Sequence, residues 1–174
     1  MTDQEPDQQG DEAAGAPGTS ASADLGQRFL ARLIDGVLLW LIFVAIIAPI
    51  IVGVFNGSPG VGAAFGGFGV DGVITGTVWA AFVVGYFTLM ESFRGRTVGK
   101  ILMKLKTQGP DGEKVTLEMA FKRNIWYALI IIPIIGGLAT LGVVIYITMT
   151  ISQSQTNTGW HDTFAGGTVV IETG

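Results

Sequence analysis

The chain has 174 residues, of which 49% are hydrophobic and only 14% are charged. A soluble domain carries about 25% charged residues, so this composition argues against an ordinary soluble protein and favours a membrane protein. The length allows one domain and excludes an elaborate multidomain enzyme. There is no Cys and only one His, which excludes disulfides and thiolate metal ligands and leaves a metal site unsupported. We therefore expect no cofactor and no metal.

The charges are segregated along the chain. The first 27 residues hold six acids and no Lys or Arg, whereas eight of the ten Lys and Arg lie between Arg94 and Arg123. This pattern says more than the net charge of −4. A basic segment beside apolar stretches is explained by topology and by anionic lipid headgroups, so nucleic-acid binding is not expected.

The first half of the chain predicts an acidic tail followed by two membrane spans. Residues 1–24 contain no aromatic or branched aliphatic residue and are predicted to be a disordered tail before a membrane domain over 25–171. The first span covers about 30–55, and Pro49 is expected to kink its outer half. A Gly-rich loop over 56–72 separates it from a second span over about 73–92.

The second half predicts a basic loop over 93–124, a third apolar stretch over 125–151 and a polar tail over 152–174. Within the loop, a strand, turn and strand are expected over 101–117, and a short amphipathic interfacial helix over 117–125, with Leu117 and Phe121 on one face. The third stretch contains Pro133 and a glycine pair. A full crossing is favoured, and a re-entrant hairpin that returns the tail to the inner side is the alternative. The expected fold is an all-α membrane protein with about three transmembrane helices.

The distribution of Lys and Arg also predicts the orientation. The loop over 93–124 holds most of them and the loop over 56–72 holds none, so the positive-inside rule places the first loop in the cytoplasm and the second outside. Arg28 and Arg32 place the N-terminus in the cytoplasm too. The prediction is a multi-pass protein of the cell membrane.

A few charges lie where charges are costly, and these are the candidate site residues. Asp35 is at the inner end of the first span, three residues after Arg32 and seven after Arg28. It is either an ion or proton site or an interfacial anchor neutralised by one arginine. Glu91 ends the second span and is expected to pair with Arg94 or Arg96. Asp162 beside His161 lacks a third partner, so no catalytic residue is assigned and the protein is expected not to be an enzyme.

Three short segments form recognisable motifs. They are residues 28–35 (RFLARLID), residues 95–100 (GRTVGK), which include Gly95, Arg96, Thr97, Gly99 and Lys100, and residues 161–170 (HDTFAGGTVV). The GRTVGK segment fails as a nucleotide phosphate-binding loop, because only three residues separate its glycines and Ile101 follows its lysine. Together the three segments resemble the RDD family of bacterial membrane proteins, and GRTVGK is similar to that family's G-R-T-x-G-K loop. The resemblance makes Arg28, Asp35 and Asp162 the residues that give the family its name.

Two functional hypotheses follow. The resemblance implies a transport role, in the form of monovalent cation and proton exchange, with Asp35 as the titrating or cation-binding carboxylate and Asp162 as a second acid. The alternative is a non-transporting accessory or scaffold subunit that packs on another membrane protein through small residues. In either case the lipid bilayer is one partner, and a homo-oligomer or another membrane protein is expected because three spans enclose little volume.

Overall fold

The first membrane segment is one long helix with a local change of winding. The computed structural model describes residues 22–55, 70–132 and 136–173, and within them α1 (Leu25–Ile42) continues through a π-helical segment, η1 (Phe43–Ile47), into α2 (Ala48–Phe55). Pro49 lacks an N–H group and its ring displaces the carbonyl one turn earlier, which explains why the winding changes just before it. The stretch over Leu25–Ile51 is long and apolar enough to cross a membrane.

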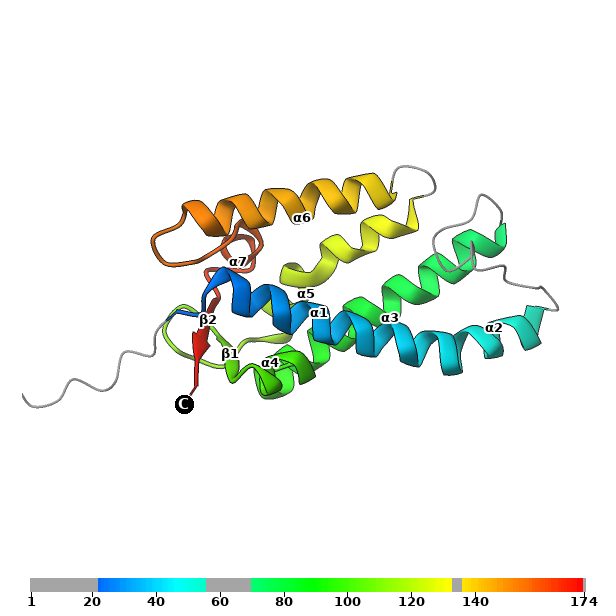
Figure 1. Ribbon diagram of the computed structural model, residues 1–174, viewed down its shortest axis with the longest axis horizontal. Coiled ribbons are helices and arrows are strands. Elements are labelled where there is room, and N and C mark those ends of the chain that lie inside the picture. The colour runs from blue at the N-terminus through cyan, green and yellow to red at the C-terminus, as the bar shows by residue number, and fades with distance from the viewer. Residues whose placement is uncertain (1–21, 56–69, 133–135, 174) are drawn as a thin grey trace, which may run out of the picture.

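The second segment, α3 (Val70–Arg94), runs back alongside the first (Figure 1). Its candidate membrane span is Val73–Arg94. Leu39 of α1 packs with Val83 and Phe87 of α3 in a buried apolar cluster. Phe43 meets Trp79 edge to face at 4.9 Å between ring centroids, which extends this contact toward α2.

The third apolar stretch differs from the favoured expectation of a single crossing over 125–151. It consists of a 3-10 helix, η3 (Ile125–Ile131), and a separate helix, α6 (Gly136–Gln153), which run in opposite directions and pack together (Figure 1). Gly136 permits this turn, because a Cβ atom there would lie 3.1 Å from the carbonyl carbon of Ile130 and would overlap the carbonyl oxygen of Leu129. The chain thus reverses between η3 and α6, as the hairpin alternative expects, and the candidate third span is Gly136–Gln153.

The basic loop folds into short elements, but the expected strand–turn–strand is wrong in its pairing. After α4 (Val98–Leu102), the strand β1 (Leu105–Gln108) pairs antiparallel with β2 (Val169–Glu172) near the C-terminus, and residues 113–116 form no strand. The amphipathic helix is confirmed as α5 (Leu117–Asn124), with Leu117 and Phe121 exposed. A further short helix, α7 (Trp160–Phe164), precedes β2.

The two ends of the described chain meet at this sheet. Ser22 forms a β-bridge with Ile171, and the Ala23 amide donates to the carbonyl oxygen of Val170 at 2.9 Å. Residues 22–24 are therefore part of the fold, contrary to the expected tail over 1–24; residues 1–21 lie outside the described part, as do residues 56–69 of the expected Gly-rich loop. Because α6 returns toward β2, the tail lies at the same end of the molecule as the N-terminal part of α1, which we call the sheet end.

Candidate functional site

Asp35 is completely buried, and it caps the helix formed by the GRTVGK motif. Its Oδ1 accepts hydrogen bonds from the Gly99 amide at 2.7 Å and the Tyr86 hydroxyl at 2.8 Å, and its Oδ2 accepts one from the Thr97 hydroxyl at 2.5 Å. Thr97 is the N-cap of α4, so the carboxylate lies at the positive end of that helix. The expected pairing of Asp35 with Arg28 or Arg32 is wrong, because both arginines have other partners.

The glycines of the motif are required by close packing. Gly95 has φ +66°, and a Cβ there would lie 2.9 Å from the carbonyl oxygen of Thr107. Gly99 packs directly on the backbone of α1, where a Cβ would overlap the carbonyl group of Ala31. Arg96 of the same motif is partly exposed and forms no ion pair with any described residue. The motif therefore docks α4 on α1 and places its lysine inside.

Glu91 forms a second buried centre. Its Oε1 accepts hydrogen bonds from the Lys100 ammonium group at 2.5 Å and from Arg32 Nη2 at 3.2 Å, and its Oε2 accepts one from the Asn124 amide at 3.1 Å. The expected pairing with Arg94 or Arg96 is thus replaced by cations from α4 and α1. Burial lowers the pKa of Lys100, and the charge of Glu91 opposes that shift. The guanidinium carbon of Arg32 also lies 4.0 Å from the ring centroid of Phe87, in a cation–π contact.

Asp162 forms the third centre, and the hairpin brings it to Arg28. Its Oδ2 lies 3.2 Å from Arg28 Nη1, and its Oδ1 lies 3.0 Å from Arg123 Nη2. Its Oδ1 also accepts from the Thr168 hydroxyl at 3.2 Å. Burial opposes ionisation, yet the charges of Arg123 and Arg28 hold the pKa of Asp162 below its ordinary value. Asp162 therefore links the start of α1, the end of α5 and the start of α7.

His161 is not arranged as the base of a catalytic dyad. Its Nε2 lies 3.6 Å from Asp162 Oδ1, which is longer than a hydrogen bond. Burial lowers the pKa of His161 to about 3, against the opposing charge of Asp162, so the ring is neutral at pH 7. Within the described residues no group of three or more His, Cys, Asp or Glu is placed to hold a metal ion.

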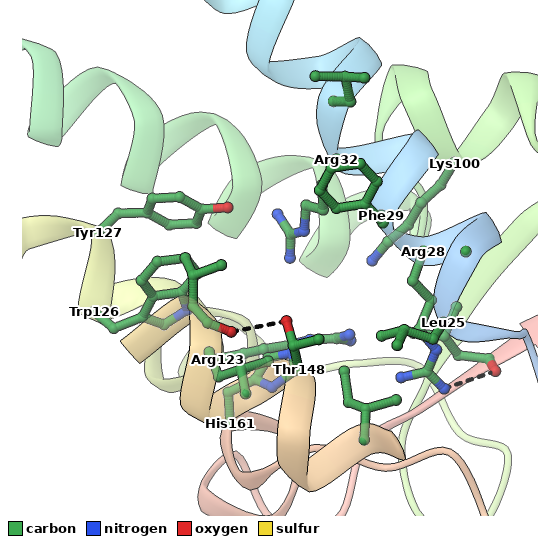
Figure 2. Close-up of a pocket in the computed structure, with 16 residues that line it drawn as sticks. Leu25, Arg28, Phe29, Arg32, Lys100, Arg123, Trp126, Tyr127, Thr148 and His161 are labelled. Atoms are coloured by element: carbon green, nitrogen blue, oxygen red, sulfur yellow. Dashed lines mark hydrogen bonds between the residues drawn. The ribbon is translucent and has the colours of Figure 1, made fainter. Parts of the chain in front are cut away.

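Four basic residues of these centres line one pocket of about 490 Å³ between α1 and α6. Arg28 and Arg32 come from α1, Lys100 from α4 and Arg123 from α5, and none of the lining residues is acidic. Figure 2 shows Arg32 and Lys100 extending toward Arg123 across the pocket, with Trp126 and Tyr127 at one side. Glu91 and Asp162, which pair with these bases, are completely buried and do not line the pocket. The pocket therefore presents positive charge to whatever enters it.

Sequence reasoning identified the acids but missed several of their partners. Tyr86 binds Asp35, Arg123 binds Asp162 and Asn124 binds Glu91. Tyr86 lies in an apolar run, and the positive-inside rule alone accounts for Arg123 in the sequence. A signal was present: Arg123 and Asn124 follow Ala120 at helical spacing, which marks one buried face of α5.

A family model described as RDD family matches residues 22–166. The chain belongs to the RDD family. Neither the curated proteins nor the solved structures that were compared with this RDD protein include a match. With its apolar helices, it is a membrane protein. Two of the three residues that give the family its name, Arg28 and Asp162, are joined by an ion pair, while Asp35 caps α4 in the adjacent centre.

Proposed function

We propose that this RDD protein binds an anion in the pocket between α1 and α6, and that its buried ion pairs hold the cationic wall of that pocket in place. The observation that carries the proposal is the convergence of Arg28, Arg32, Lys100 and Arg123 on one pocket whose lining includes no acid. The four bases pair with two buried acids, Glu91 and Asp162. Asp35, in the adjacent centre, is the third buried acid, which leaves one positive charge in surplus.

The electrostatics of the pocket favour an anion over a cation. A monovalent cation 4 Å from the one surplus positive charge would be repelled by about 4 kcal/mol at an effective dielectric constant of about 20. An anion gains the same interaction and also accepts charge-assisted hydrogen bonds from guanidinium groups, which match carboxylate and phosphate oxygens in geometry.

Equilibrium dialysis of the purified full chain in neutral detergent tests this proposal. Glycerol phosphate and sodium ions are offered separately, each with a radioactive label. We expect one glycerol phosphate per chain, binding at least tenfold weaker in Arg32→Gln and unchanged in Arg94→Gln, which removes the same charge from an exposed position outside the pocket. Absence of anion binding, or equal loss in both variants, contradicts the proposal.

Exchange of monovalent cations for protons is the second candidate, and Asp35 is the observation that favours it. This carboxylate is buried within a candidate membrane span, and a cation or proton there would have to replace the donors from Thr97, Tyr86 or Gly99. Liposomes that contain only this protein provide the test. Exchange of sodium or potassium that disappears in Asp35→Asn supports this function, and its absence with folded protein contradicts it.

We also propose that the protein lies in the cell membrane with its sheet end facing the cytoplasm, because most Lys and Arg belong to the segment between α3 and η3. In this role the protein is not an enzyme but a binding or accessory component, acting as a homo-oligomer or beside another membrane protein. A Lys114→Cys variant tests this orientation. We expect its thiol to react with a membrane-impermeant reagent only after the membrane is permeabilised.

A further inference from the structure

The pocket combines an apolar wall with a cationic floor, which is the polarity of an amphiphile. Phe29 and Leu33 of α1 line one side, and Val144, Ile147 and Ile151 of α6 line the other. Phe29 is 65% exposed and Leu33 50% exposed, so this wall continues onto the outer surface of a helix that is apolar enough to cross a membrane. A hydrocarbon chain lying along this wall reaches the bilayer without crossing a polar surface.

The floor of the pocket presents buried donors that lack an acceptor. Nε and Nη1 of Arg123 and Nη1 of Arg32 have no hydrogen-bond partner among the described residues. Arg123 is only 2% exposed, so these donors are buried polar groups, which ordinarily have an acceptor. Trp126, which also lines the pocket, leaves its ring N–H without a described partner. Several donors from different directions suit a group with several acceptor oxygens, as a phosphate has.

Aromatic side chains mark the depth of the pocket relative to a membrane surface. Trp160 stacks on Phe164 within α7 and meets Tyr146 of α6 at a tilted angle, with 6.0 Å between ring centroids, and each of the three is more than 40% exposed. The Trp160 amide donates to the Thr150 hydroxyl at 3.0 Å, which ties this cluster to the last turns of α6, where Ile147 and Ile151 line the pocket. Exposed Trp and Tyr gather at the level of lipid headgroups. The cationic floor therefore lies near the depth of headgroup phosphates.

We propose that the pocket is a binding site for a phospholipid with an anionic headgroup. The phosphate accepts hydrogen bonds from Arg32 and Arg123, and an acyl chain lies between Leu33 and Val144. Basic pockets between helices near a membrane surface suit anionic headgroups in this way. The inference rests on the proposed anion-binding function and adds the source of the anion, a lipid that enters sideways from the bilayer.

Native mass spectrometry of the delipidated full chain in neutral detergent tests this inference. Phosphatidylglycerol and phosphatidylcholine with identical acyl chains are titrated separately, beside glycerol phosphate, which has no chain. We expect one phosphatidylglycerol per chain and at least tenfold weaker binding of the other two ligands. Equal affinity for the two lipids overturns the inference.

Matched variants locate the site without disturbing the ion pairs. Val144→Trp fills the pocket between α1 and α6, whereas Ile145→Trp adds the same ring at the next position, which does not line the pocket. We expect Val144→Trp to lose phosphatidylglycerol binding and Ile145→Trp to keep it; retention in both overturns the inference. Glycerol phosphate that binds as tightly as the lipid leaves the anion-binding function standing and rejects the lipid. Binding of none of the three ligands rejects both.

Discussion

Replacing Gly99 by Ala should separate α4 from α1 and destabilise the protein strongly. The new Cβ would overlap the carbonyl oxygen of Ala31 and lie 2.9 Å from its carbon and 3.0 Å from Asp35 Cγ. Two of these atoms belong to the backbone of α1, so rotation of a side chain does not relieve the overlap. The α4 helix has to shift, and the hydrogen bond from the Gly99 amide to Asp35 is lost.

The magnitude follows from these two effects. Overpacking costs about 1–3 kcal/mol, and a lost hydrogen bond to a buried carboxylate costs about 1.5–3 kcal/mol. The total, roughly 2.5–6 kcal/mol, corresponds to a fall of roughly 5–24 °C in melting temperature for a chain of this size. Samples in detergent are heated to a series of temperatures, and size-exclusion chromatography of each sample gives the fraction still folded and hence the melting temperature.

Gly36→Ala is the matched control for this prediction. Gly36 lies in α1, beside Asp35, and a Cβ there meets nothing within 4 Å. We expect this variant to equal the original chain or to gain about 0.5–1 kcal/mol, because Ala restricts the unfolded backbone more than Gly. A Gly99→Ala protein as stable as Gly36→Ala would refute the claim that the motif docks α4 on α1 through this glycine.

Three further predictions concern the buried centres. Asp162→Asn leaves two buried guanidinium groups without their counter-charge and should cost about 3–5 kcal/mol in thermal unfolding, whereas Glu118→Gln, which removes an exposed carboxylate, should leave the melting temperature unchanged. The folded protein holds His161 neutral down to about pH 3 while the unfolded chain takes up a proton near pH 6.5, so stability should fall by about 2 kcal/mol from pH 7 to pH 5. His161→Gln should flatten that pH dependence, and an unchanged slope would contradict it. Thr97→Val removes a donor to Asp35 and should lower the melting temperature more than Thr97→Ser, which keeps the hydroxyl.

The sequence was sufficient to predict the membrane segments and the acidic residues that the fold buries. Apolar runs of span length have few alternatives in a bilayer, which is why the two spans expected over 30–55 and 73–92 overlap the candidate spans Leu25–Ile51 and Val73–Arg94. Asp35 and Glu91 stood out because a charge beside an apolar run is costly, and Asp162 stood out because it follows the only histidine; all three are completely buried. Membership of the RDD family was likewise visible in three short motifs.

The partners of those residues were not predictable from spacing along one helix. Arg32 is one turn from Asp35 in α1, but it pairs with Glu91 of α3 and contacts Asn124 of α5, because tertiary packing placed those groups closer. The position of Asp162 depended on the break between η3 and α6. A run of 27 apolar residues suits a single span, and only the backbone packing at Gly136 decides for the hairpin. The pairing of β1 with β2 depends on the same return of the chain.

Solid-state NMR on the full chain in phosphatidylglycerol vesicles tests the central claim most directly. Dipolar dephasing of arginine side-chain ¹⁵N signals by ³¹P reports guanidinium groups in contact with phosphate. The account predicts a dephased signal that disappears in Arg32→Gln and in Val144→Trp but persists in Arg94→Gln and Ile145→Trp. Dephasing that is the same in all four variants would contradict an anion held in the pocket between α1 and α6.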